Sequence, residues 1–179
     1  FLISILLFLL IPKFLNFDEK QEIINKNLDN HYNLQINNFS SINFKIFPLP
    51  NLYISNADLK VSNKPINFRV KDFRIYLKLK NIYNQKNFLL KKILINSSEV
   101  DLEIKDSKEL FNFLASFKSK LEISNLNISL NKEKERIIKI KNIDYSNYGH
   151  KKNKIEGVLF NKKFEAIFKN NELKFNILK

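Results

Sequence analysis

The sequence predicts a mainly β protein: an N-terminal transmembrane helix and a short amphipathic helix, then a long, curved antiparallel sheet with one short helix inserted near residues 107–117. Three observations support this prediction. The chain opens on an apolar run at residues 1–11, apolar and polar residues alternate through most of the chain after residue 33, and short Asn-rich connectors separate the alternating segments. We expect the sheet to form a groove or a half-open sandwich over residues 34–179, incomplete at its C-terminal end.

Residues 1–17 contain the predicted membrane anchor. The eleven residues of the apolar run would make a helix of only about 16 Å, roughly half of a bilayer core, so we expect the rest of the span upstream. A cleaved signal peptide is an alternative, but it needs small residues at its cleavage site, whereas residues 12–17 read Pro-Lys-Phe-Leu-Asn-Phe. A buried helix of a soluble domain is the third interpretation.

Residues 18–33 predict a short amphipathic helix. Acidic residues come first, and Ile23, Ile24 and Leu28 follow at helical spacing. Asn33 is the expected left-handed residue at its end, because Asn tolerates positive φ better than most residues.

The alternating segments after residue 33 predict strands, most of them joined as antiparallel hairpins in a meander. The chain has only two Gly, so we expect Asn to take the turn positions, as in 63–65, 131–134, 161–163 and 170–172. The predicted strands cover residues 34–36, 42–47, 52–61, 66–79, 88–104, 121–130, 137–145, 155–160, 164–168 and 173–178.

One segment breaks the two-residue pattern. Residues 107–117 follow an Asp106-x-x-Glu109 capping pattern and carry apolar residues at intervals of three and four, which predicts a helix on an end or a face of the sheet. The apolar positions are Leu110, Phe111, Leu114 and Phe117.

The alternation also changes phase inside the two longest strands. Phe68 and Val70 share one parity, whereas Phe73 and the apolar residues after it share the other, and a similar change separates residues 93–95 from 100–104. A slip of one residue turns side chains to the opposite face unless a bulge absorbs it, so we predict bulges near residues 71–72 and 96–98.

Residues 47–61, Phe-Pro-Leu-Pro-Asn-Leu-Tyr-Ile-Ser-Asn-Ala-Asp-Leu-Lys-Val, resemble the N-terminal region of AsmA-family proteins, in which a Phe-Pro-x-Pro turn leads into an alternating strand. The order of parts is similar too: anchor, short helix, first strands, this turn, then further strands. The resemblance covers roughly residues 1–117. The chain departs from the family pattern at Tyr32-Asn33 (usually Thr-Gly), at Lys86 (a common Gly) and at Ser98 (often Pro).

The resemblance implies a single-pass protein of a bacterial inner membrane with its bulk in the periplasm, involved in outer-membrane biogenesis, and with phospholipid and other envelope proteins as partners. Larger members resemble bridge-like lipid transporters with an apolar β-groove. Pro48 and Pro50 would set the rigid turn. A closed sandwich core is the structural alternative for the apolar stripes. The candidate lining residues are Phe68, Val70, Ile75, Leu77, Ile93, Ile95, Val100, Leu102, Ile104, Leu121, Ile123, Ile128 and Leu130.

Composition argues against several other function classes. The net charge of +13 invites a nucleic-acid interpretation, but lysines are spread along nearly every strand, so we expect no nucleic acid. Attraction of the lysines to anionic lipid head groups is an alternative. The chain has no Cys, and its two histidines, His31 and His150, lie far apart, so we expect no metal, no cofactor and no catalytic residue. Asp101 and Glu103 alternate with apolar residues as a solvated strand face would.

A second function class stays open. The chain would then be a non-transporting, membrane-tethered interaction module, similar to the jellyroll component of lipopolysaccharide export. This alternative predicts a compact closed fold that binds a partner through an exposed sheet edge.

Overall fold

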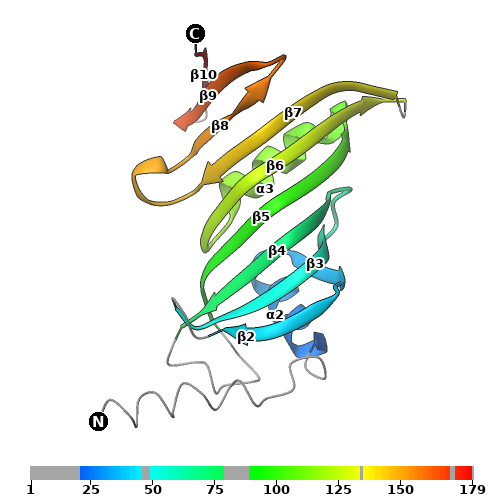
Figure 1. Ribbon diagram of the computed structural model, residues 1–179, viewed down its shortest axis with the longest axis vertical. Coiled ribbons are helices and arrows are strands. Elements are labelled where there is room, and N and C mark those ends of the chain that lie inside the picture. The colour runs from blue at the N-terminus through cyan, green and yellow to red at the C-terminus, as the bar shows by residue number, and fades with distance from the viewer. Residues whose placement is uncertain (1–20, 46–48, 79–88, 134, 170–171, 179) are drawn as a thin grey trace.

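A computed structural model describes residues 21–45, 49–78, 89–133, 135–169 and 172–178, and these form a mainly β structure built on one ten-stranded, mostly antiparallel open sheet (Figure 1). Two helices lie on one face of it, α2 (Gln21–Tyr32) and α3 (Ser107–Ser116). The predicted anchor lies outside these residues; within them, no helix is long and apolar enough to cross a bilayer. The strands are β1 (Leu34–Asn38), β2 (Ser41–Lys45), β3 (Asn51–Val61), β4 (Asn67–Leu77), β5 (Leu90–Glu103), β6 (Lys120–Lys132), β7 (Glu135–Ser146), β8 (Lys154–Leu159), β9 (Lys162–Lys169) and β10 (Glu172–Ile177).

The strands follow one another through the sheet in almost their sequence order. β1 and β2 share one side of β3, β1 against residues 58–61 and β2 against residues 51–55, and the sheet continues from β4 to β10. The prediction of a meander is wrong at one place, because β5 and β6 are parallel, with Lys92 opposite Lys120. α3 carries the chain back along the sheet, so β6 starts at the same end as β5, as a helical crossover requires.

Across the middle of the sheet, one residue in each of several neighbouring strands interrupts the alternation of inward and outward side chains. The inward positions of β3 change from Leu52 and Ile54 to Ala57 and Leu59, and the change falls at Asn56, whose φ is +48°. β5 changes at Ser97 (φ +53°) and β6 at Asn125 (φ +55°), while β4 changes at residues 71–72 without a left-handed residue. The predicted phase changes in β4 and β5 are therefore confirmed.

These changes differ from the bulges that we predicted. A bulge places two residues opposite one, but Ser55 and Ala57 of β3 pair with Asp72 and Val70 of β4 with no shift of register. The same holds from β4 to β5 and from β5 to β6, because each strand carries its extra residue at the same level as its neighbour. At this level of the sheet, register shifts appear in the next two strand pairs, β6–β7 and β7–β8, where Asn142 of β7 has φ +52°. We call Asn56, Lys71, Ser97 and Asn125 the fold line.

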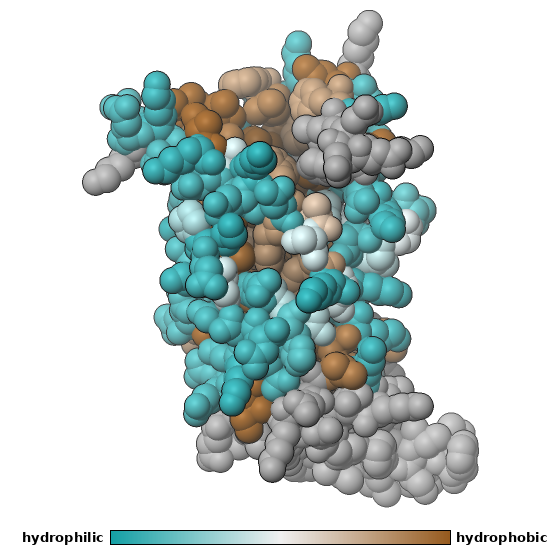
Figure 2. Space-filling model, turned by 180° about the vertical axis from the view of Figure 1, so that it is seen from behind, coloured by the Kyte–Doolittle hydropathy of each residue, from teal (hydrophilic) through white to brown (hydrophobic). Residues whose placement is uncertain are grey.

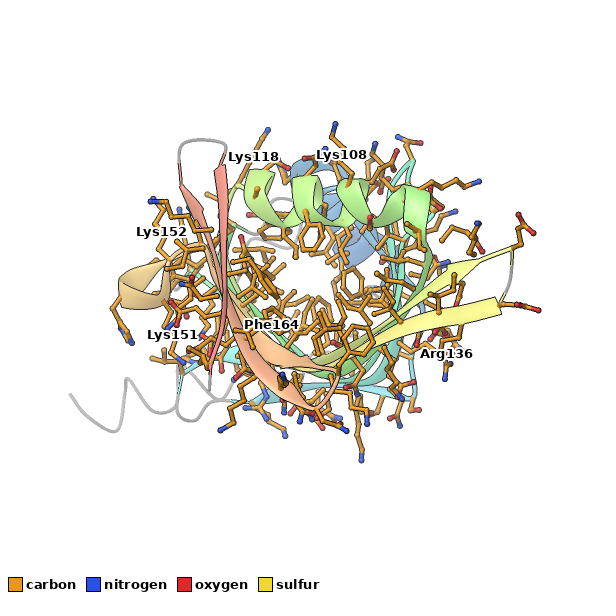
Figure 3. All side chains as sticks on the ribbon, turned by 90° about the horizontal axis from the view of Figure 1, so that it is seen from above. Lys108, Lys118, Arg136, Lys151, Lys152 and Phe164 are labelled. Atoms are coloured by element: carbon orange, nitrogen blue, oxygen red, sulfur yellow. The ribbon has the colours of Figure 1, made fainter. Side chains whose placement is uncertain are left out.

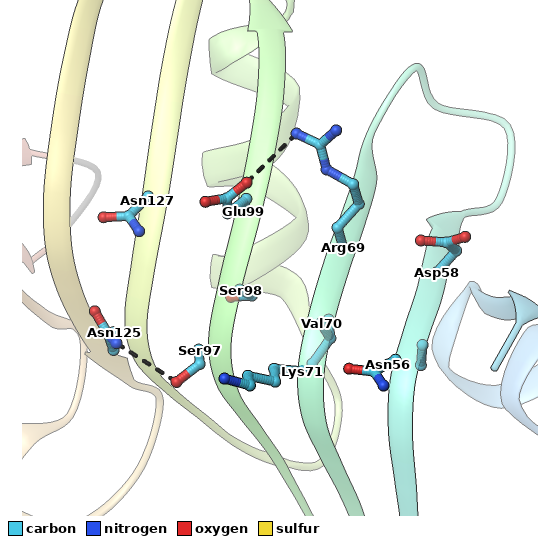
Figure 4. Close-up of a pocket in the computed structure, with 11 residues that line it drawn as sticks. Asn56, Asp58, Arg69, Val70, Lys71, Ser97, Ser98, Glu99, Asn125 and Asn127 are labelled. Carbon is cyan, nitrogen blue, oxygen red and sulfur yellow. Dashed lines mark hydrogen bonds and ion pairs between the residues drawn. The ribbon is translucent and has the colours of Figure 1, made fainter. Parts of the chain in front are cut away.

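Asn suits the fold line because its side chain tolerates positive φ and offers local hydrogen bonds. The Asn56 amide donates to Ser40 Oγ at 3.2 Å, and the Asn125 amide lies 3.5 Å from Ser97 Oγ (Figure 4). The backbone N–H of Asn125 also donates to Asp144 at 2.9 Å. Side chains thus bind backbone and hydroxyl groups where the regular ladder is interrupted.

α2 closes the first edge of the sheet. Ile24 and Leu28 are buried, and Asn33 takes the predicted left-handed conformation, with φ +53°. The Asn25 side chain bonds both backbone groups of Ile36, each at 2.8 Å, and so replaces a neighbouring strand. Asp29 accepts hydrogen bonds from Ser62 and Gln35, which lower the pKa of its carboxyl.

We predict that Asn56→Val destabilises the protein by about 1–2 kcal/mol more than Asn56→Gly, because only Val is strained at positive φ. Both variants lose the bond to Ser40, so the difference isolates the backbone conformation. Urea unfolding measures both. Lys60→Val, on the exposed side of the same strand, is the control and should change stability by less than about 0.5 kcal/mol; equal stability of the two Asn56 variants would contradict the prediction.

Candidate functional site

The candidate lining residues lie together on one face of the sheet, the inward face, which carries α2 and α3. Cross-strand pairs join them, such as Phe68 with Val100 and Ile75 with Ile93. Leu130 is partly buried at the margin of the core. Ile104 is misplaced by the prediction, because β5 ends at Glu103 and Ile104 lies in a 3-10 turn, 41% exposed. The remaining members are all buried: Phe68, Val70, Ile75, Leu77, Ile93, Ile95, Val100, Leu102, Leu121, Ile123 and Ile128.

α3 lies on this face, behind β5, β6 and β7 in Figure 1, and its position on a face of the sheet agrees with the prediction (Figure 3). Its Leu110 and Leu114 are buried, and the Phe113 ring packs against Phe68 with centroids 6.4 Å apart. Phe117, after the end of the helix, stacks on Tyr32 of α2 at 5.7 Å. The predicted side-chain cap at Asp106 is not made, because a 3-10 turn already places Asp106 in the helical region.

Beneath the helices, the inward face is a sealed hydrophobic core. Phe68, Ile75 and Ile93 have no exposed surface. An acyl chain would reach these side chains only if the packing around them opened. In this part of the sheet, the apolar stripes are buried.

The inward face continues past the helices onto β8, β9 and β10, where it becomes accessible. Residues directly opposite in an antiparallel pair share a face, and Phe175 and Ile177 of β10 lie opposite the buried Ala166 and Phe164. Phe175 is 46% exposed and Ile177 59%. Figure 2 shows hydrophobic surface gathered toward the C-terminal end of the sheet, between hydrophilic margins. We call Phe164, Phe175 and Ile177 the open end.

Gly157 makes the open end possible. A Cβ on Gly157 would lie 2.8 Å from the ring of Phe164, so only Gly leaves room for that ring. Phe164 in turn stacks on Phe175, with centroids 5.3 Å apart and planes 23° apart. The result is a flat aromatic pair, buried on the β9 side and exposed on the β10 side. Sequence analysis missed these residues, although a lone Gly within a strand signals close packing.

The opposite, outward face is polar and is hollowed where the fold line crosses it. The hollow encloses about 510 Å³, and Asn56, Lys71, Ser97 and Asn125 lie along it (Figure 4). Arg69 borders it, 2.6 Å from Asp101 and 3.6 Å from Glu99. Asp101 is thus an ion-pair partner on the solvated face.

The two histidines belong to separate elements. His31 packs edge-on against Tyr32 at the end of α2, and His150 is exposed in the connection before β8. No group of three His, Asp or Glu in the described segments could hold a metal ion. Pro50 directly precedes β3, while Pro48, and with it the first part of the predicted turn, lies outside the described residues.

Tyr145 ties α3 to the sheet. Its side chain is buried on β7, and its hydroxyl donates to the backbone carbonyl of Leu114 at 2.9 Å. Burial raises the pKa of Tyr145 to about 12, because the phenolate would lose its hydration.

We predict that Tyr145→Phe lowers the free energy of unfolding by about 1–2 kcal/mol at neutral pH, because the Leu114 carbonyl loses its partner. The folded pKa is raised above the unfolded value, so this group's contribution is complete below pH 10 and is lost between about pH 10 and about pH 12. The stability difference between wild type and variant should therefore shrink over that range in urea unfolding. A difference that stays constant to pH 12 would refute the assignment.

Comparison with known proteins finds no matching family model, no matching curated protein and no matching solved structure.

Proposed function

We propose that the chain is a membrane-anchored, AsmA-like envelope protein that holds phospholipid acyl chains against the apolar inward face of its sheet, in the service of outer-membrane biogenesis. Its localisation would be the bacterial inner membrane, with the sheet in the periplasm. The observation that supports this function best is the continuity of the inward face, which passes from the sealed core to the exposed Phe175 and Ile177.

The physical need for such a face is large. An acyl chain of about 16 carbons exposed to water costs on the order of 13 kcal/mol, at about 0.8 kcal/mol per methylene. A continuous apolar lining removes this cost along the path of the chain. The open end supplies accessible apolar surface, whereas the residues beneath α2 and α3 contribute stability and curvature.

The contact therefore centres on the open end rather than on the whole set of lining candidates. Leu77 and Leu102 are 6% and 2% exposed and lie within the core. β10 offers a cleaner comparison, because Phe175 and Ile177 point inward while Lys174 and Asn176 lie at the alternate, outward positions of the same strand. All four side chains are exposed.

A second function is favoured by a different feature of the same strand. β10 is the last strand of the sheet in the described residues, and its far side has no neighbour there. An unpaired strand edge can accept a strand from a partner protein. The chain would then act as a tethered assembly module that need not carry lipid.

We predict that photo-crosslinkers at Phe175 and Ile177 capture phospholipid in cells, whereas those at Lys174 and Asn176 do not. The strand, its exposure and its depth along the sheet are matched, so only the face differs. Mass spectrometry of the adducts identifies the captured molecule.

Equal lipid labelling at all four positions would contradict the acyl-binding function. Capture of protein, with no lipid adduct at either inward position, would favour the assembly module instead.

A further inference from the structure

The two ends of the strands differ sharply in charge. Pairing places Lys45, Leu90, Lys120 and Ser146 at one end of the sheet and Val61, Glu103, Lys132 and Leu159 at the other. We call these ends the basic rim and the mixed rim. Each rim consists of the connecting segments and the strand-terminal residues beside them.

Among the described residues of the basic rim, lysines outnumber acidic residues, because only Glu172, at the start of β10, is acidic. Its lysines come from four separate connections: Lys45, Lys78, Lys91, Lys118, Lys120, Lys151, Lys152 and Lys154. On the mixed rim, acidic residues offset the lysines, with Lys64, Lys105, Lys132 and Lys162 against Glu103, Asp106, Glu133 and Glu135. The difference between the rims is not visible in the total charge of +13.

Several cations of the basic rim are available to an external partner. Lys78, Lys91, Lys118 and Lys152 are exposed, and no ion pair within the described residues holds them. By contrast, Lys154 lies between Glu156 and Glu165, at 2.9 and 2.8 Å.

Exposed apolar side chains accompany these lysines. Leu49 is 50% exposed and lies in the connection between β2 and β3, and Leu89 is 42% exposed and lies in the connection between β4 and β5. Tyr148 adds an amphipathic ring, with the Lys120 ammonium 5.4 Å from its centroid. Lysine with leucine and tyrosine is the combination found at the level of lipid head groups.

From these observations we propose that the basic rim docks on the anionic surface of the membrane, so that the strands lead away from the bilayer. The lysines bind lipid phosphates, Leu49 and Leu89 enter the interface, and the mixed rim faces away. The docking surface rests in part on the anchor of the proposed function, but not on acyl-chain binding at the open end.

The test uses the full chain in lipid nanodiscs made of phosphatidylcholine alone or with added phosphatidylglycerol. The chain has no Cys, so one donor dye can be placed at His150→Cys on the basic rim or at Phe160→Cys on the mixed rim. Acceptor dyes on the lipid head groups then report proximity by energy transfer. We expect the dye at residue 150 to approach the bilayer when phosphatidylglycerol is present, and to move away in 1 M salt, where the Debye length is about 3 Å.

Charge reversal supplies the matched control. Lys91→Glu, Lys118→Glu and Lys152→Glu together should lower the ratio of docked to undocked protein at least about a hundredfold, at about fivefold per lysine. Lys105→Glu, Lys132→Glu and Lys162→Glu, on the mixed rim, should leave it unchanged. The proposal would be overturned if energy transfer from residue 150 did not depend on lipid charge, or if the dye at residue 160 lay closer to the bilayer than the dye at residue 150. Lipid capture at Phe175 is measured separately, so either idea can fail alone.

Discussion

The fold line is the constraint on which the rest of the structure depends. β3, β4, β5 and β6 each contain one residue too many for strict alternation, and all four place it at the same level. Each strand therefore turns its apolar residues inward on both sides of the line, while neighbouring strands keep their register. A single strand with this extra residue would lose half of its core contacts. Four neighbouring strands that carry the extra residue at the same level keep the inward face apolar along their whole length.

Sequence periodicity was sufficient to predict the mainly β class, both described helices and the levels at which β4 and β5 change phase. It did not predict that neighbouring strands change phase at the same level. Periodicity is judged within one strand, whereas the register is preserved by the pairing between strands. The parallel pair β5–β6 was missed for a similar reason: the helix at residues 107–117 was identified, but not its direction across the sheet. The predicted strand included Ile104, which lies one residue beyond the end of β5, in a 3-10 turn.

For the candidate site, the same reasoning placed the apolar residues on one face but did not show which part of that face is exposed. Two-residue spacing places Phe68 or Ile93 on the inward face but cannot show that α3 covers it. Phe175 and Ile177 fit the same pattern, yet their exposure follows from their position beyond the helices. In the proposed account, core, open end and basic rim have separate roles. The core stabilises the curved sheet, the open end binds acyl chains, and the basic rim docks on the membrane so that the strands lead away from the bilayer.

The central claim is that the open end binds phospholipid through its inward side chains. Native mass spectrometry of the full chain, released from mild detergent, tests it most directly. The account predicts bound phospholipid in the wild type, its loss in Ile177→Asp and its retention in Asn176→Asp, whose new charge lies one position away on the outward face. Equal lipid content in all three proteins, or no bound lipid in the wild type, would contradict it.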